Sequence, residues 1–172
     1  MKTLIFAGST RSDSLNRKLA REIARSVPES TLIELRDLPM PLYDGDLEAA
    51  EGVPASARTF KKLLREHETL IIASPEYNGF FPALVKNVID WATRPEPGES
   101  HSLAFCGKRV VLVSASPGPG GGRRGLVQLR EQLEAIGASV IGEVSVPKAL
   151  HADFAAVARE VAQMADLQMK AA

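Results

Sequence analysis

The sequence has very little cysteine and no net charge. Cys106 is its single cysteine, so no disulfide can form within the chain and no cluster of thiolates is available to hold a metal. The 21 basic and 21 acidic residues cancel, which leaves no net field to attract a nucleic acid or an anionic membrane. We therefore expect a cytoplasmic protein with small-molecule partners and with no nucleic-acid or membrane partner.

Long apolar runs are also missing from the sequence. None approaches the ~20 residues that a membrane-spanning helix needs. The opening apolar run stops at Gly8, short of the roughly 7 to 15 apolar residues of a signal peptide, so we expect a first β-strand there. A chain of 172 residues is long enough to bury one substantial core, and we expect a single domain over residues 1–172.

Short apolar runs alternate with longer stretches of helical period along the chain. This alternation is typical of an α/β protein with a parallel sheet. Because crossover connections are right-handed, few strand orders remain. We predict a flavodoxin-like, doubly wound, five-stranded parallel sheet of order 2-1-3-4-5 with helices on both faces. The predicted strands span residues 3–7, 31–35, 70–74, 109–114 and 139–144.

Five helices are predicted between and after these strands. Ser14 or Asp13 can cap the start of the first helix. Pro39 and Pro41 fall within residues 38–52, which we therefore expect to form an irregular loop. The predicted helices span residues 15–27, 55–67, 82–92, 126–136 and 152 onward.

Three of the predicted strands end in small and polar residues that lead directly into a helix. We call these segments loop 1 (residues 8–16), loop 3 (residues 74–81) and loop 4 (residues 114–122), after the strands that they follow. Parallel strands place their carboxyl ends at one edge of the sheet, so the three loops should converge there. That edge is where α/β proteins bind nucleotide-like ligands, and we expect a binding site at it.

Loop 1 offers donors that suit a phosphate. It lies at a helix start, where backbone N–H groups and the helix dipole favour an anion. It has one glycine, not the three of a dinucleotide fingerprint, so a terminal monophosphate such as that of flavin mononucleotide (FMN) fits better than a diphosphate. The alternative is an ordinary turn that caps a helix. The candidate donors are Ser9, Thr10, Arg11, Ser12, Ser14 and Asn16.

Loop 3 places polar and aromatic residues between an apolar strand and a helix start. Tyr77 and either Phe80 or Phe81 are candidates to contact a planar ring. Asn78 is a candidate to bond the edge of that ring. Glu76 is a conceivable general acid or base, but no partner for proton transfer is evident, and anchoring the loop or pairing across a subunit boundary fits it better.

The other candidate functional residues have patterns that favour a structural role over a catalytic or metal-binding one. His67, His101 and His151 lack the spacing of a metal site, so we expect no metal. No histidine adjoins the loop serines, which argues against a nucleophilic triad. Trp91 lies one residue beyond the apolar face of its helix, so we expect it to be partly exposed and to contact another subunit.

Three ordered motifs stand out when the loops are taken together. They are Gly8-Ser9-Thr10-Arg11-x-x-Ser14-x-Asn16, then Pro75-Glu76-Tyr77-Asn78 with Leu84-x-Lys86-Asn87-x-x-Asp90-Trp91, then Ser116-Pro117-Gly118 with Gly121-Gly122. From residue 4 to about residue 142, the chain resembles the NADPH-dependent FMN reductase family. That family has a flavodoxin-like fold and includes quinone, chromate and azo-dye reductases.

The resemblance implies FMN as the cofactor and NADPH or NADH as the electron donor. It implies that loop 1 holds the FMN phosphate, that loop 3 lines the isoalloxazine ring and that loop 4 covers the other edge of the ring. The implied FMN-binding residues are Ser9, Arg11, Ser14 and Asn16 in loop 1, Pro75, Glu76, Tyr77 and Asn78 in loop 3, and Ser116, Gly118 and Gly121 in loop 4.

The sequence departs from the family pattern after loop 4. Arg123 and Arg124 follow the glycine run, where the resemblance leads us to expect one arginine. They could meet the 2′-phosphate of NADPH or an anionic acceptor. They could equally be solvated charges at a helix start or contacts between subunits.

We therefore expect an NAD(P)H oxidoreductase that passes hydride to bound FMN and then to a quinone, flavin, azo or chromate acceptor by a ping-pong mechanism. No side chain is needed as an obligatory catalyst. The resemblance implies a homodimer or homotetramer with the flavin near the subunit boundary, which residues 93–107 could reach. The alternative is a non-enzymatic flavodoxin-type electron carrier or redox-sensing module, but such carriers are usually acidic and this chain is neutral.

Overall fold

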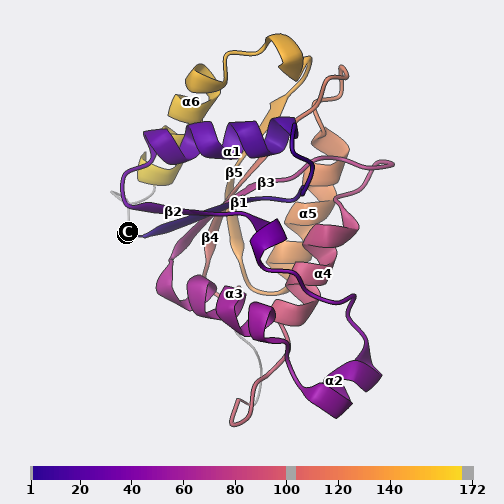
Figure 1. Ribbon diagram of the computed structural model, residues 1–172. Helices are drawn as coiled ribbons and strands as arrows, with labels where there is room; N and C mark the ends of the chain where they lie inside the picture. Colours follow the sequence, from indigo (N-terminus) through magenta and orange to yellow (C-terminus); the bar gives the residue numbers. More distant parts are fainter. Residues whose placement is uncertain (1, 100–103, 168–172) are drawn as a thin grey trace.

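The computed structural model describes residues 2–99 and 104–167. Five strands form one parallel sheet in the order β2-β1-β3-β4-β5 (Figure 1), which confirms the predicted order. The first and third strands are neighbours in the sheet, and from this point the chain adds strands outward in opposite directions. The strands are β1 Thr3–Ala7, β2 Ser30–Ile33, β3 Thr69–Ala73, β4 Arg109–Ala115 and β5 Ser139–Val146.

Helices cover both faces of the sheet. Helices α1 and α6 lie on one face, and α3, α4 and α5 lie on the other (Figure 1). The described residues also form two short 3₁₀ turns, Leu35–Asp37 and Ala149–His151. The helices are α1 Leu15–Ser26, α2 Gly45–Glu51, α3 Ala55–Glu66, α4 Ala83–Ala92, α5 Arg123–Ala135 and α6 Phe154–Leu167.

The central strands are apolar throughout because helices bury both of their faces. In β3, Leu70 and Ile72 pack toward α3, α4 and α5, whereas Ile71 and Ala73 pack toward α1 and α6. All four side chains are at most 1% exposed. The two cores on either side of the sheet hold the carboxyl ends of β1, β3 and β4 in fixed relative positions.

Residues 38–52 differ from the prediction, because α2 forms within a segment that we expected to be irregular. The two prolines precede this helix and so do not interrupt it. Asp44 caps its start by accepting a hydrogen bond from the backbone N–H of Asp46 at 2.8 Å. The prediction was wrong because it gave weight to the prolines and none to the capping aspartate.

Trp91 also differs from the prediction, because its side chain is 0% exposed. Its indole N–H donates to the carbonyl of Pro41 at 2.8 Å, and its ring packs edge-on against Tyr43. Asn87, one turn earlier on α4, donates to the same carbonyl at 2.9 Å and accepts from the N–H of Tyr43 at 2.7 Å. The segment that contains α2 therefore covers the side of α4 that the sequence suggested was open.

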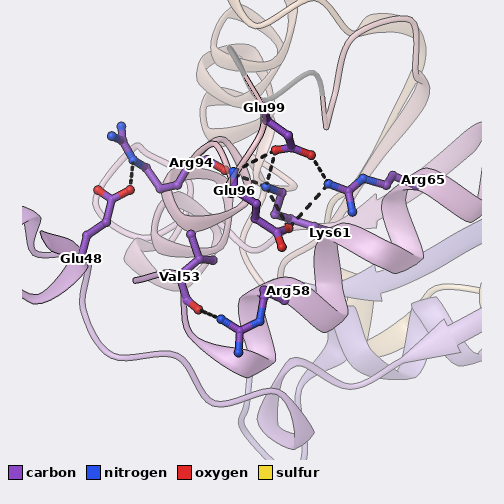
Figure 2. A network of polar contacts seen from close by, with 8 residues as sticks. All are labelled: Glu48, Val53, Arg58, Lys61, Arg65, Arg94, Glu96 and Glu99. Atoms are coloured by element: carbon purple, nitrogen blue, oxygen red, sulfur yellow. Dashed lines mark hydrogen bonds and ion pairs between the residues drawn. The ribbon is translucent and has the colours of Figure 1, made fainter. Parts of the chain in front are cut away.

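The segment that follows α4 is held by a buried lysine. Lys61 on α3 is 1% exposed, and its ammonium donates to the carbonyl of Arg94 at 2.7 Å. The same ammonium pairs with the carboxylates of Glu96 and Glu99 at 3.1 Å each, and Arg65 approaches both carboxylates from the next turn (Figure 2). This network anchors the start of the α4–β4 connection to α3.

No helix within residues 2–99 and 104–167 is long and apolar enough to cross a membrane. Across those same residues, His, Cys, Asp and Glu side chains form no group that could hold a metal ion. His101 lies outside the described residues. His67 is buried, and its ring nitrogens lie 2.7 Å from the carbonyl of Leu63 and 2.9 Å from the hydroxyl of Thr31, which is a structural role.

Candidate functional site

A pocket of about 350 Å³ opens at the carboxyl edge of the sheet, where loops 1, 3 and 4 converge. This confirms that the three loops meet. Leu150, in the turn after β5, also lines the pocket and was missed by the sequence analysis. Asn78, Gly118 and Gly121 belong to the same loops but do not line it. The predicted residues that line it are Ser9, Arg11, Ser14, Asn16, Pro75, Glu76, Tyr77 and Ser116.

The start of α1 presents two buried hydroxyls to this pocket. Ser14 caps the helix by accepting from the backbone N–H of Arg17 at 3.4 Å, which decides between Ser14 and Asp13. Ser9 accepts from the backbone N–H of Arg11 at 3.4 Å. Each oxygen accepts from the backbone here, so each hydroxyl proton remains available to a ligand acceptor. Two hydroxyl donors beside a helix N-terminus suit an anion.

Asn16 lines the pocket and also makes a structural contact that the sequence analysis did not predict. Its amide donates to the carbonyl of Ala115 and accepts from the N–H of the same residue, both at 2.9 Å. The side chain is 3% exposed. Asn16 therefore joins loop 1 to the end of β4 and fixes the distance between two of the three loops.

Arg17 was not singled out by the sequence analysis, yet it holds loop 1 in place. It is 5% exposed and donates to the carbonyl of Arg11 at 2.6 Å and to the carboxylate of Glu34 at 2.7 Å. Burial opposes ionisation of Glu34, but hydrogen bonds from Arg17 and Arg21 outweigh it and keep the pKa of Glu34 below its usual value. The ion pair thus ties the pocket to the end of β2.

Arg11 supplies an accessible positive charge at the mouth of the pocket. Its side chain is 70% exposed and pairs with Asp13 at 3.1 Å. The hydrogen bond from Arg11 lowers the pKa of Asp13 below its usual value. Because the pair is exposed, it stabilises the loop little, and the guanidinium can turn to another anion at small cost.

Loop 3 contains a tight β-hairpin that projects two aromatic rings. Tyr77 and Phe80 exchange two backbone hydrogen bonds, of 2.9 and 3.1 Å, around Asn78 and Gly79 at φ of 53° and 82°. An Asn-Gly pair is the preferred sequence for such a two-residue turn. Tyr77 and Phe80 are 49% and 46% exposed, whereas Phe81 is buried in the core. Of the two phenylalanines considered, Phe80 is therefore the accessible one.

Glu76 anchors loop 3 to the start of α5. One carboxylate oxygen accepts from the backbone N–H of Gly125 at 3.2 Å, and the other pairs with Arg124 at 3.2 Å. The cap residue of α5, Gly122, has no side chain to do this, so Glu76 satisfies an N–H of the first turn from outside. The anchoring role considered for Glu76 is confirmed, and Arg124 is its exposed partner.

Loop 4 depends on glycines that have no room for a side chain. A Cβ on Gly121 would lie 2.3 Å from Oγ of Ser145, and one on Gly122 would lie 1.9 Å from Oγ of Ser114. Both glycines have positive φ. Ser116 closes the loop by accepting from the N–H of Gly118 at 3.2 Å. Loop 4 is therefore packed directly on β4 and β5, and it lines the pocket with Ala115, Ser116 and Pro117.

Comparison with known proteins identifies the family. The model of the NADPH-dependent FMN reductase family matches residues 1–151. The chain belongs to this family. The NAD(P)H-dependent FMN reductase PA1204 of Pseudomonas aeruginosa is 37% identical over 134 residues, which cover 77% of this chain and 69% of that protein. A quinone reductase of Escherichia coli (strain K12) is 32% identical over 147 residues, which cover 83% of this chain and 74% of that protein.

A solved structure supports the assignment. The FerB flavoenzyme NAD(P)H:(acceptor) oxidoreductase of Paracoccus denitrificans is similar with a TM-score of 0.69 and 30% identity, covering 80% of this chain and 72% of that one. This chain spans between 61% and 74% of the length of the curated relatives that it matches. Family membership makes FMN the cofactor and NAD(P)H the electron donor.

The residues of the pocket fit FMN. The end formed by loop 1 offers hydroxyls, a helix N-terminus and Arg11, which match a phosphate that carries about two negative charges. The end formed by loop 3 offers the accessible ring of Tyr77, and loop 4 contributes Ala115, Ser116 and Pro117. The two ends of the pocket therefore match the two ends of the cofactor.

Proposed function

We propose that the protein is an FMN-dependent NAD(P)H oxidoreductase that delivers electrons to a quinone, flavin, azo or chromate acceptor. The observation that carries the proposal is the convergence of loops 1, 3 and 4 on one pocket whose donors match FMN. Its family membership supports an oxidoreductase over a non-enzymatic carrier. The single cysteine supports a cytoplasmic setting.

Each loop has a separate task in this proposal. Ser9, Ser14 and Arg11 bind the phosphate at the start of α1, while Asn16 holds loop 1 against β4. Pro75 to Asn78 line the isoalloxazine ring, and Ser116 to Gly121 cover its other edge. When bound, FMN supplies the hydride-transfer chemistry. The chain orients the ring and limits its access to water, and no side chain acts as an obligatory acid or base.

Donor and acceptor use the same open side of the pocket in turn, which is a ping-pong mechanism. Anaerobic stopped-flow mixing of the flavin-loaded protein with NADPH or NADH tests the first half-reaction, and a panel of acceptors tests the second. We expect bleaching of the flavin absorbance by at least one nicotinamide and parallel lines in double-reciprocal plots. A flavin that neither nicotinamide reduces at a useful rate would instead favour an electron carrier.

Glu76→Gln should lower the rate of flavin reduction by less than about threefold. The amide oxygen of glutamine can still accept from the N–H of Gly125, so only the exposed pair with Arg124 is lost, and such pairs contribute about 0 to 1 kcal/mol. Stopped-flow reduction by NADPH across a range of pH measures the effect. A drop of roughly 100-fold, the size expected for removal of a general acid or base, would show that Glu76 transfers a proton.

Arg11→Ala should weaken FMN binding by about tenfold. A charge-assisted hydrogen bond contributes about 1.5 to 3 kcal/mol, and the lower end applies because the guanidinium must leave Asp13. Fluorescence titration of the protein with FMN measures the dissociation constant. Arg25→Ala is the matched control, since Arg25 pairs with Glu22 on the same helix and does not line the pocket. An unchanged constant for Arg11→Ala would remove Arg11 from the phosphate site.

We also propose a homodimer or homotetramer with the flavin pocket near the subunit boundary. Support comes from the exposed rings of Tyr77 and Phe80 beside the pocket. Trp91 gives no support to the proposed subunit contact, because its side chain is buried. Residues 93–99 turn back onto α3, and residues 100–103 lie outside the described residues. Light scattering at micromolar concentration should report an oligomer, and a pure monomer would contradict the proposal.

A further inference from the structure

A second cavity, of about 270 Å³, also borders loop 1. The two cavities share no lining residue, but Thr10 lines the second and its neighbours Ser9 and Arg11 line the first. We call the second one the Arg36 cavity. Its walls come from the segment after β2 and from α4, and they are mostly aliphatic. The apolar lining residues are Leu35, Leu38, Pro39, Met40, Leu84 and Val88.

Asn87 and Arg36, two polar residues that line the Arg36 cavity, differ in how many of their hydrogen-bonding groups already have partners. The amide nitrogen of Asn87 donates to the backbone of Pro41, and its amide oxygen accepts from the backbone of Tyr43. Arg36 is exposed and donates to the carbonyl of Thr10. Within the described part of the chain, no carboxylate pairs with Arg36, and no acidic side chain lines the cavity. Most of the five N–H donors of this guanidinium are therefore open to an anion.

We propose that the Arg36 cavity is a binding site for a small ring compound that carries a carboxylate or sulfonate group. The ring would lie against the aliphatic walls, with Leu35 and Val88 as its buried floor. The anionic group would bond to Arg36 at the mouth. A mostly apolar lining with one convergent charge is the usual composition of a small-molecule site, and the volume suits a bicyclic ring.

The fluorescence of Trp91 can report binding in the Arg36 cavity. Trp91 is the single tryptophan of the sequence, and it bonds to Pro41, which directly follows the cavity residues Pro39 and Met40. A ligand that moves this segment changes the surroundings of Trp91. The contact between Arg36 and Thr10 also connects the cavity to loop 1, so its occupant can alter the phosphate end of the flavin pocket.

Binding of naphthalene-2-sulfonate to the protein saturated with FMN tests the proposal, with the neutral naphthalene-2-sulfonamide as the matched probe. Calorimetry measures the affinity and Trp91 emission reports the site. We expect the sulfonate to bind at least about tenfold more tightly than the sulfonamide, because one charge-assisted hydrogen bond is lost with the neutral group. FMN should stay bound throughout, and its binding should not be competitive with the sulfonate.

Three variants complete the test. Arg36→Gln should weaken sulfonate binding about tenfold, and Leu84→Phe should reduce it further by filling the cavity. Arg159→Gln, on the opposite face of the sheet, should have no effect. The proposal is overturned if the two probes bind equally, if Arg36→Gln changes nothing, if FMN displaces the sulfonate, or if no binding occurs because a second copy of the chain covers the cavity.

Discussion

Gly122→Ala should lower the free energy of unfolding by about 2 to 5 kcal/mol and weaken flavin binding, because a shift of loop 4 moves the pocket residues Ser116 and Pro117. Gly122 has φ of 81°, a conformation that costs other residues about 1 to 2 kcal/mol. Its new Cβ would stand 1.9 Å from Oγ and 2.8 Å from Cβ of Ser114, and such overpacking adds about 1 to 3 kcal/mol. Urea unfolding and FMN titration of the same preparation measure both effects.

Gly120→Ala is the matched control within the same loop. No atom lies within 4 Å of the place where its Cβ would stand, and its φ is not positive, so stability should be unchanged. Adding Ser114→Ala to Gly122→Ala should recover part of the loss, because the closest contact is with a hydroxyl that has no hydrogen-bond partner among the described residues. Equal stability of Gly120→Ala and Gly122→Ala would contradict the geometry given for loop 4.

Lys61→Met should lower the free energy of unfolding by about 2 to 3 kcal/mol. Breaking a buried ion pair costs about 3 to 5 kcal/mol, and the figure is reduced here because Glu96 and Glu99 are 22% and 31% exposed. Methionine fills most of the space left by the lysine, so the loss is mainly electrostatic. Lys62→Met is the control, since Lys62 is 73% exposed and should contribute little.

The effect of Lys61→Met should also depend on pH. A backbone hydrogen bond at Glu96, followed by the bond from Lys61, lowers the pKa of Glu99 below its usual value. A lowered carboxylate pKa stabilises the fold above the ordinary glutamate pKa of about 4.3, and the contribution is lost as the pH falls through the lowered value. The difference between the two proteins should therefore shrink below about pH 4, and a constant difference from pH 7 to pH 3 would contradict the network.

The sheet could be predicted from the sequence because its central strands are buried on both faces and so appear as continuous apolar runs. The bounds of the edge strand β2 were predicted less accurately. This strand was expected at residues 31–35 but ends at Ile33, because Leu35 begins a 3₁₀ turn. Helix α2 was missed since none of its seven residues is buried, so it leaves no apolar stripe. Because the segment that contains α2 covers Trp91, missing this helix also led to the wrong prediction that Trp91 is partly exposed.

Site residues whose roles depend on their neighbours in the sequence could be predicted. Site residues whose contacts lie far away in the sequence could not. The hydroxyls of loop 1 and the Asn-Gly turn of loop 3 are visible in short stretches of sequence. The bonds of Asn16 to Ala115 span 99 positions, and nothing near Asn16 in the sequence indicates them. Arg17 gave no signal either, because a buried arginine on a helix looks like a solvated one until Glu34 is placed beside it.

The central claim is that loop 1 binds the terminal phosphate of FMN. The most direct measurement compares the affinities of the flavin-free protein for FMN and for riboflavin, which differ only in that phosphate. Several charge-assisted hydrogen bonds at the start of α1 should make FMN bind at least about 100-fold more tightly, or about 2.7 kcal/mol, with the gap narrowing in Arg11→Ala. Equal affinity for the two flavins would contradict the account of loop 1.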